Sequence, residues 1–165
     1  METVLYETET IYTQREYKKY SYVIYRRINK IDIMTILLML CDLIIVAIEY
    51  SKGDYVAAIK NIVYGSLFLI LLKVIIEIKI NKSWKDNRLI QGQKTQIKFY
   101  ENYLEAISSI GNTKIDYDKL YKVLETKENF YLLINKAQGI VIEKCNCKEE
   151  LIQYLKVKKA LVDKK

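Results

Sequence analysis

The chain contains no histidine, no proline and only three cysteines among its 165 residues. Without histidine, no nucleophile–base pair of the kind used by hydrolases is identifiable. A structural zinc ion takes four ligands, typically Cys or His, and Cys145 and Cys147 supply only two. No Gly-rich phosphate-binding loop occurs. We therefore expect a non-enzymatic protein, with no catalytic residue, no metal site and no cofactor.

The cysteine count also bears on the compartment. It is odd, and Cys41 lies inside an apolar run, which excludes a disulfide framework and indicates a reducing compartment. The first thirty residues hold no uninterrupted apolar stretch, so we expect no cleaved signal peptide.

Charge is distributed unevenly along the chain. Residues 1–30, 31–80 and 81–165 carry net charges of +2, −1 and +6, which make up the overall +7. The nearly neutral middle is rich in Ile, Leu and Val. Acidic residues alternate with the lysines elsewhere, so no continuous basic stripe for a nucleic acid is predicted.

Two long apolar segments, Ile31–Tyr50 and Tyr55–Ile80, occupy this middle part. About 20 helical residues cross a hydrocarbon core of about 30 Å. Neither segment has a polar face wide enough to meet water, which disfavours a soluble helical bundle. The short linker around Gly53 and Asp54 makes the two helices antiparallel neighbours. The sequence predicts a transmembrane helical hairpin over residues 31–80.

Basic residues flank the predicted hairpin at its two open ends. Those that follow the second span are Lys79, Lys82, Lys85 and Arg88, and three others precede the first span. The connecting turn carries only Lys52 among its acidic neighbours. Positive charge beside a span stays cytoplasmic, so we expect a multi-pass protein of the cell membrane with both termini in the cytoplasm. The four residues after the second span are candidates for contacts with anionic lipid.

Asp42 interrupts the first apolar segment near its centre, about 14 Å from Ile33 at the helical rise. A centred Asp costs about 2.5–3.5 kcal/mol on insertion scales, so its side chain should face protein. Lys73 on the second span is the candidate partner, although Glu77 could pair with Lys73 instead and leave Asp42 protonated. Such a pair either fixes the register of the hairpin or belongs to an ion or proton pathway.

The first thirty residues read as a strand followed by a helix. "TVLYETETIYT" alternates like a strand, and "TQRE" is a capping box that opens a helix from Thr13 to about Asn29. This Tyr-rich, basic, amphipathic helix could lie in the lipid headgroup zone or pack on the C-terminal domain. The strand has no sheet of its own, so we expect it to add to Tyr103–Ser109 or a neighbouring edge of the C-terminal sheet.

After the second span the pattern changes to short strands separated by tight turns. "KTQIKFY", "YLEAISS", "KIDY", "YKVLET", "FYLLIN" and "IVIEK" predict an antiparallel meander. "NCKEELIQYLKVKKAL" predicts a helix with Asn146 as its N-cap, and Leu151, Tyr154 and Leu155 as the stripe that covers the sheet. Residues 81–165 therefore predict a bent sheet closed by a C-terminal helix.

The segment Ile97–Lys144, with "FYENYLE", "IDYDKLYKV", "ETKENFYLLINKAQ" and "IVIEK", followed by "CKEELIQYLKVKK", resembles the C-terminal domain of the YcxB-like family. These are small bacterial membrane proteins with an N-terminal strand and helix, two spans, and a cytoplasmic domain similar to the pleckstrin-homology fold. The resemblance implies an α+β membrane protein in three parts, 1–30, 31–80 and 81–165. It brings no catalytic residues.

Two functions are compatible with these patterns. The first is an integral membrane protein whose cytoplasmic pleckstrin-homology-like module binds protein, peptide or anionic lipid, with a protein or peptide partner at the sheet edge. The alternative is a subunit of an oligomeric transporter or channel with Asp42 and Lys73 in its path.

Overall fold

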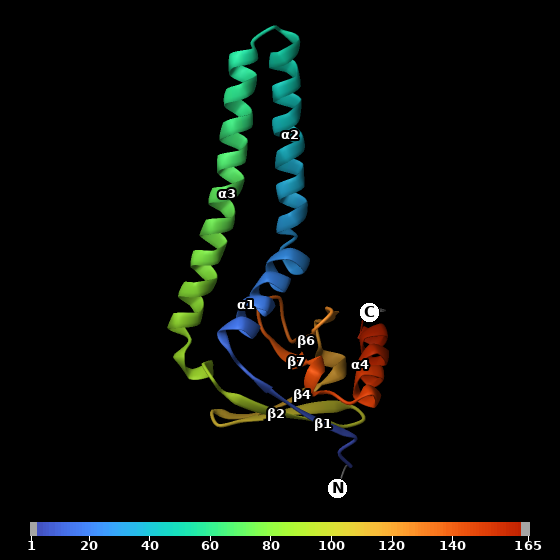
Figure 1. Ribbon diagram of the computed structural model, residues 1–165. Coiled ribbons are helices and arrows are strands. Elements are labelled where there is room, and N and C mark those ends of the chain that lie inside the picture. Colours follow the sequence, from blue (N-terminus) through green and yellow to red (C-terminus); the bar gives the residue numbers. More distant parts are fainter. Residues whose placement is uncertain (1–2, 163–165) are drawn as a thin grey trace. The chain divides into compact units, whose positions relative to one another are not determined.

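The computed structural model describes residues 3–162 and divides the chain into two compact units (Figure 1). The sheet unit consists of the residues up to Tyr20 together with those from Asn87 on. The hairpin unit consists of Ser21–Asp86. The hairpin unit is thus inserted in the sequence of the sheet unit, and each is described separately below.

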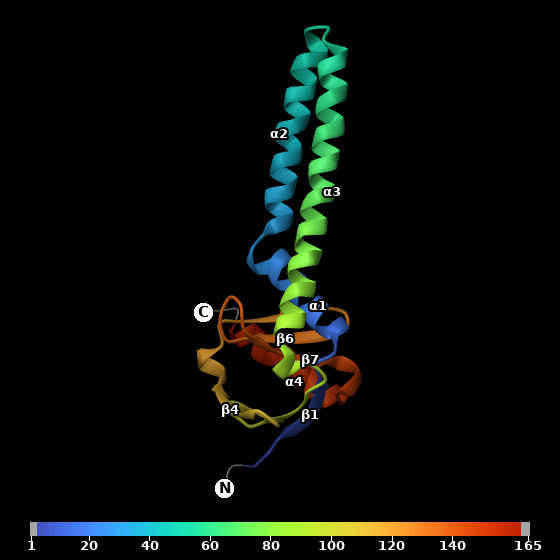
Figure 2. The same ribbon diagram turned by 90° about the vertical axis from the view of Figure 1, so that its left-hand side faces the viewer.

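The sheet unit holds two antiparallel sheets. The first has the strand order β1-β2-β3-β4, and the second has the order β5-β6-β7. The strands are β1 (Tyr6–Ile11), β2 (Lys94–Phe99), β3 (Tyr103–Ser108), β4 (Gly111–Asp116), β5 (Lys122–Glu125), β6 (Asn129–Leu133) and β7 (Gly139–Glu143). Single-turn helices are η2 (Arg88–Ile90), η3 (Tyr117–Lys119) and η4 (Lys144–Asn146), and the last element is helix α4 (Glu149–Val162). Figure 2 shows the two sheets curving around a common interior.

One hydrophobic core lies between the two sheets and α4. Ile97, Phe99 and Leu104 come from the first sheet, and Phe130 and Ile142 from the second. Leu151 and Leu155 of α4 are also fully buried, as the predicted apolar stripe requires. Burial of a large aliphatic or aromatic side chain contributes about 1.5–3 kcal/mol, so this shared core holds the two sheets and the helix together.

The N-terminal strand is a full member of the first sheet. Residues of β1 pair with β2 in antiparallel register from Tyr6↔Phe99 to Ile11↔Lys94. The predicted addition of this strand to the C-terminal sheet is confirmed, but at β2. The other expected partner, Tyr103–Ser109, was wrong because β3 is already paired with β2 and β4.

The predicted helix from Thr13 to Asn29 is two elements. Helix α1 covers Gln14–Val23, and a π-helical turn, η1, covers Ile24–Ile28. Lys30 then adopts a left-handed backbone conformation (φ 52°) before α2 begins, which separates the segments. Thr13 caps α1 as predicted, with its Oγ1 accepting from the Glu16 amide at 3.2 Å.

Glu16 does not reach back to complete the capping box. It is buried and accepts hydrogen bonds from Lys19 at 2.6 Å and from the side chain of Asn129 on β6. Tyr20 packs on Tyr131, with ring centroids 5.9 Å apart. Of the two predicted locations for this helix, packing on the C-terminal domain is therefore the one found for residues 14–20.

Helix α4 begins later than predicted. Its first residue is Glu149, and Asn146 instead ends the preceding turn η4. The Asn146 side chain donates to the carbonyl of Glu9 at 2.9 Å, so it binds β1 and does not cap α4. The expected N-cap was wrong because this amide has a partner far away in the sequence.

The hairpin unit contains two long antiparallel helices, α2 (Ile31–Ser51) and α3 (Tyr55–Asp86) (Figure 2). Asp54 caps α3 by accepting from the amide of Ala57 at 3.0 Å, and Gly53 supplies a positive φ of 79° in the turn. Both helices are long and apolar enough to cross a membrane, and none of their most apolar windows is buried within the protein. The helix α3 continues beyond the predicted end at Ile80, since neither Gly nor Pro occurs before Gly92.

Candidate functional site

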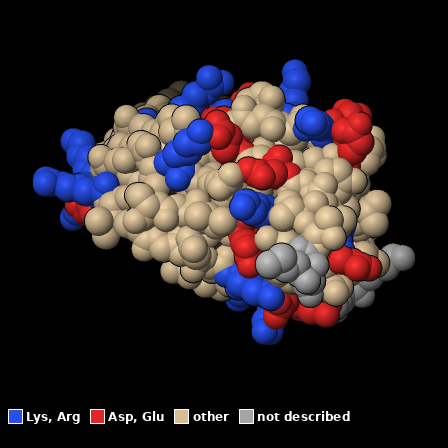
Figure 3. All heavy atoms as spheres, turned by 90° about the horizontal axis from the view of Figure 1, so that it is seen from below, with Lys and Arg blue, Asp and Glu red and all other residues tan. Residues whose placement is uncertain are grey.

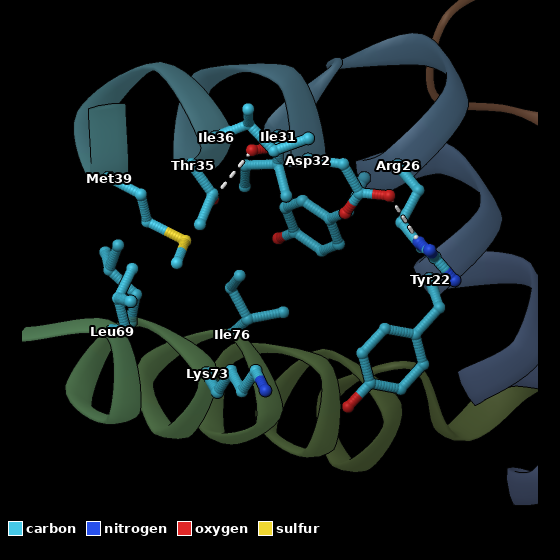
Figure 4. Close-up of a pocket in the computed structure, with 12 residues that line it drawn as sticks. Tyr22, Arg26, Ile31, Asp32, Thr35, Ile36, Met39, Leu69, Lys73 and Ile76 are labelled. Atoms are coloured by element: carbon cyan, nitrogen blue, oxygen red, sulfur yellow. Dashed lines mark hydrogen bonds and ion pairs between the residues drawn. The ribbon is translucent and has the colours of Figure 1, made fainter. Parts of the chain in front are cut away.

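A groove of about 810 Å³ lies inside the hairpin unit, between η1, α2 and α3 (Figure 4). The apolar residues of its lining are Ile31, Ile36, Met39, Leu69, Leu72 and Ile76, from both α2 and α3. The polar residues are Tyr22, Tyr25, Arg26, Asp32, Thr35 and Lys73. A volume in this range suits a small molecule or part of a larger amphiphile.

All of these polar residues except Lys73 gather where α1 and η1 meet the start of α2. Arg26 Nε donates to Asp32 Oδ2 at 2.7 Å, across the break in the helix at Lys30 (Figure 4). Thr35 is turned back onto its own helix and donates to the carbonyl of Ile31 at 2.8 Å. Sequence reasoning missed this cluster because it predicted one continuous helix up to Asn29, and the break is what brings residue 26 next to residue 32.

Lys73 points along α3 on the opposite side of the groove (Figure 4). Its side chain is exposed, and within residues 3–162 it forms neither an ion pair nor a hydrogen bond. Glu77, one turn further on, accepts hydrogen bonds from the Tyr22 hydroxyl and from Asn81 Nδ2 at 3.2 Å. The alternative partner expected for Lys73 is thus engaged elsewhere.

Asp42 lies against α3 at Gly65, which is a different place from Lys73. A Cβ atom added at Gly65 would lie 2.5 Å from Asp42 Oδ2. Lys73 is about 12 Å further along α3 at 1.5 Å per residue, so the predicted Asp42–Lys73 pair is not formed. The carboxylate is half-buried in a smaller hollow of about 320 Å³ lined also by Met39, Cys41 and Phe68.

The hairpin helices are also joined nearer to their turn. Asn61 Nδ2 of α3 donates to Glu49 Oε2 of α2 at 2.7 Å, and the Tyr50 and Tyr55 rings meet edge to face with centroids 5.1 Å apart. Together with the Asp42–Gly65 contact, these interactions define the register of the two helices.

The four basic residues proposed for lipid contacts lie at the other end of the hairpin and just after it. Lys79, Lys82, Lys85 and Arg88 are all exposed, and the first three belong to α3. Exposure leaves their side chains accessible, which a contact with lipid headgroups requires.

The end strands of the two sheets differ in what lies beside them. The strands at the ends of the two sheets are β1, β4, β5 and β7. Among the described residues, β1 lies against β7, and α4 lies against β5. Within residues 3–162, no strand lies beside the outer edge of β4, and residues 111–114 of this strand are exposed. The outer edge of β4 therefore offers backbone groups with which another strand can pair.

Two carboxylates of β5 and β7 are held in contrasting ways. A hydrogen bond from Lys144, 2.7 Å long, holds the pKa of Glu125 below its ordinary value. Burial raises the pKa of Glu143, although its hydrogen bond with the backbone of Ile11 acts in the opposite direction. Both carboxylates link neighbouring segments of the sheet unit. Within residues 3–162, no cluster of three or more side chains that could hold a metal ion is found.

The surface of the sheet unit carries both signs of charge side by side. In Figure 3, Lys and Arg are interspersed with Asp and Glu over a largely uncharged face. Ion pairs such as Lys94–Glu9 (2.5 Å) and Lys119–Asp116 (2.7 Å) contribute to this pattern. Recognition of a nucleic-acid backbone would need a continuous basic surface, which this face does not offer.

Residues 99–156 match the family model described as YcxB-like protein. The match runs from the end of β2 through most of α4, so the chain carries a YcxB-like domain, and the resemblance predicted from the sequence is confirmed. The matched part includes neither β1 nor the hairpin. No curated protein and no solved structure matches the chain.

Proposed function

We propose that the protein is a non-enzymatic integral membrane protein that displays its YcxB-like domain as a binding module on the cytoplasmic face. The hairpin serves as the anchor, and the open edge of β4 is the binding surface for an extended peptide segment of a protein partner. The observation that carries the proposal is the insertion of two apolar helices between the paired strands β1 and β2.

The pairing of β1 with β2 supports membrane insertion as a hairpin. β1 precedes α2 and β2 follows α3, and strands that share backbone hydrogen bonds must lie on the same side of a bilayer. Two crossings meet that requirement, whereas one would not. A cleaved signal sequence at α2 would also remove β1, whose Thr8 and Thr10 are buried in the sheet unit.

The exposed apolar side chains of the hairpin support its insertion in a lipid bilayer. A core helix of a soluble protein buries its apolar face, but Leu37, Ile44, Leu67 and Ile70 are each about half exposed or more, at 61%, 60%, 51% and 59%. Apolar surface of this extent is stable in a hydrocarbon environment. The basic residues at the open ends of the hairpin favour a cytoplasmic location for the sheet unit.

The order of elements in the sheet unit supports a pleckstrin-homology-like module. Four antiparallel strands are followed by three more and then by a helix that covers the core. The β4 edge favours peptide over other ligands because unpaired backbone groups are completed by another strand.

Labelling of single-cysteine variants in intact cells tests the membrane topology. The native Cys145 thiol is exposed, so its reaction depends on access and not on burial. We expect an impermeant maleimide to label Ser51→Cys, in the turn between the spans, and to label Cys145 only after permeabilisation. Labelling of Cys145 in sealed cells would contradict the cytoplasmic assignment.

A photocrosslinking amino acid at Thr113, on the exposed part of β4, tests the binding edge. In cells we expect one discrete adduct from this position. The matched position is Gln153, which is exposed and lies on the helix α4. Equal adducts from both positions would show that proximity alone, and not strand addition, accounts for the crosslink.

A further inference from the structure

The groove of the hairpin unit contains an uncompensated positive charge. Asp32 forms an ion pair with Arg26, whereas Lys73 makes no ion pair with any described residue. The charged residues of the lining are Arg26, Lys73 and Asp32, which leave one net positive charge. Glu77 lies outside the lining and is engaged by Tyr22 and Asn81. In a medium of low dielectric constant, an unpaired ammonium group is unfavourable until an anion neutralises it.

In the proposed membrane insertion, Lys73 lies level with the inner end of the first span. Asp42 and Gly65 lie at the same level in the antiparallel pair. Eight residues further on, about 12 Å, Lys73 is level with the first turn of α2, which begins at Ile31. With Asp42 near the middle of the proposed span, this level is close to the inner end of that span, and a lysine side chain can extend several ångströms further toward the headgroups.

The distribution of polarity in the groove fits an amphiphile. Toward the middle of the hairpin it is lined by Met39, Leu69 and Leu72 alone, whereas toward the start of α2 the polar residues Arg26 and two tyrosines join Ile31 in the lining. A free inorganic anion would use only the second part. A lipid would use both, with a chain on the apolar side and a phosphate between Lys73 and Arg26.

We propose that this groove is a binding site for one anionic phospholipid of the surrounding bilayer, whose phosphate pairs with Lys73 and with the guanidinium nitrogens of Arg26 that Asp32 does not use. One acyl chain lies against Met39 and Leu69. A lipid with a single negative charge matches the net charge of the lining, whereas a zwitterionic lipid leaves the charge of Lys73 in place. This inference rests on the proposed membrane insertion.

Native mass spectrometry of the delipidated full-length protein tests the site, with phosphatidylglycerol and phosphatidylcholine of the same chain length as probes. We expect phosphatidylglycerol to bind more tightly. Because a hydrogen-bonded contact with a charged group is worth about 1.5–3 kcal/mol, Lys73→Met should weaken its binding at least about tenfold. The matched variant Lys60→Met changes an exposed lysine of the same helix outside the groove and should leave binding unchanged.

A second pair of variants tests the apolar part of the groove. Leu69→Trp fills it and should weaken binding of both lipids, whereas Leu67→Trp, exposed beside it but outside the lining, should not. Equal binding by the native protein and Lys73→Met, or equal binding of the two lipids, would overturn the proposal.

Extraction of cell membranes with alkaline carbonate separates this inference from the proposed function. Release of the native protein would overturn membrane insertion itself. Retention of all variants in the membrane, with no effect of Lys73→Met on lipid binding, would overturn the lipid site alone.

Discussion

A fragment that begins at residue 81 will fail to fold, whereas a chain in which a flexible Gly/Ser linker replaces residues 21–86 will form a stable, soluble sheet unit. The reason is β1. It supplies six residues to the first sheet, and Tyr6 packs on Tyr154 of α4 with ring centroids 5.2 Å apart. Thr8 Oγ1 also donates to the carbonyl of Asn146 at 2.9 Å. Loss of these contacts removes a large part of the 5–15 kcal/mol that stabilises a typical domain.

Circular dichroism and thermal unfolding of the two soluble proteins provide the measurement. The linked form should unfold in one cooperative transition, and the fragment should show none. In the linked form, Thr8→Asp places a charge at a buried position and should reproduce the loss, whereas Glu7→Asp at the neighbouring exposed position should not. A cooperative transition in the fragment from residue 81 would show that β1 is dispensable.

The second large effect is expected where α2 and α3 meet at Asp42 and Gly65. In Gly65→Ala, the new methyl group would lie 2.5 Å from the Asp42 carboxylate, and overpacking of this kind destabilises by about 1–3 kcal/mol. In the Asp42→Ala background the carboxylate is gone, so the same substitution should be tolerated. The gain in helix propensity from Gly to Ala is present in both backgrounds and cancels in the comparison.

Thermal unfolding of the four proteins in detergent measures this coupling. We expect a lower melting temperature for Gly65→Ala than for the native protein, and no such decrease when Asp42→Ala is also present. Ser66→Ala, at the exposed neighbouring position, is the matched control. Equal effects of Gly65→Ala in both backgrounds would mean that the contact with Asp42 does not determine the packing.

Local patterns predicted much of the fold. Short strand-like segments separated by tight turns located the strands of the C-terminal domain. Continuous apolar runs located the two long helices, and Gly53 and Asp54 located the turn between them. These features depend on neighbouring residues only, which is why one sequence is sufficient to find them.

The features that the sequence did not reveal depend on contacts between distant residues. Asn146 was predicted to cap a helix, but its side chain donates to the carbonyl of Glu9. Glu16 was predicted to complete a capping box, but its carboxylate accepts a hydrogen bond from Asn129. The groove was missed for a similar reason, because the break at Lys30 brings Arg26 to Asp32. Asp42 and Lys73 have opposite charges, but the register of the helices places Asp42 at Gly65.

The position of the hairpin between β1 and β2 has a consequence for the order of synthesis. β1 leaves the ribosome first, but its partner β2 follows only after the whole hairpin has been made. The first sheet therefore cannot be completed while the hairpin is still being translated, and contacts so distant in sequence form late in folding. A completed first sheet therefore requires that both helices of the hairpin have already been synthesised.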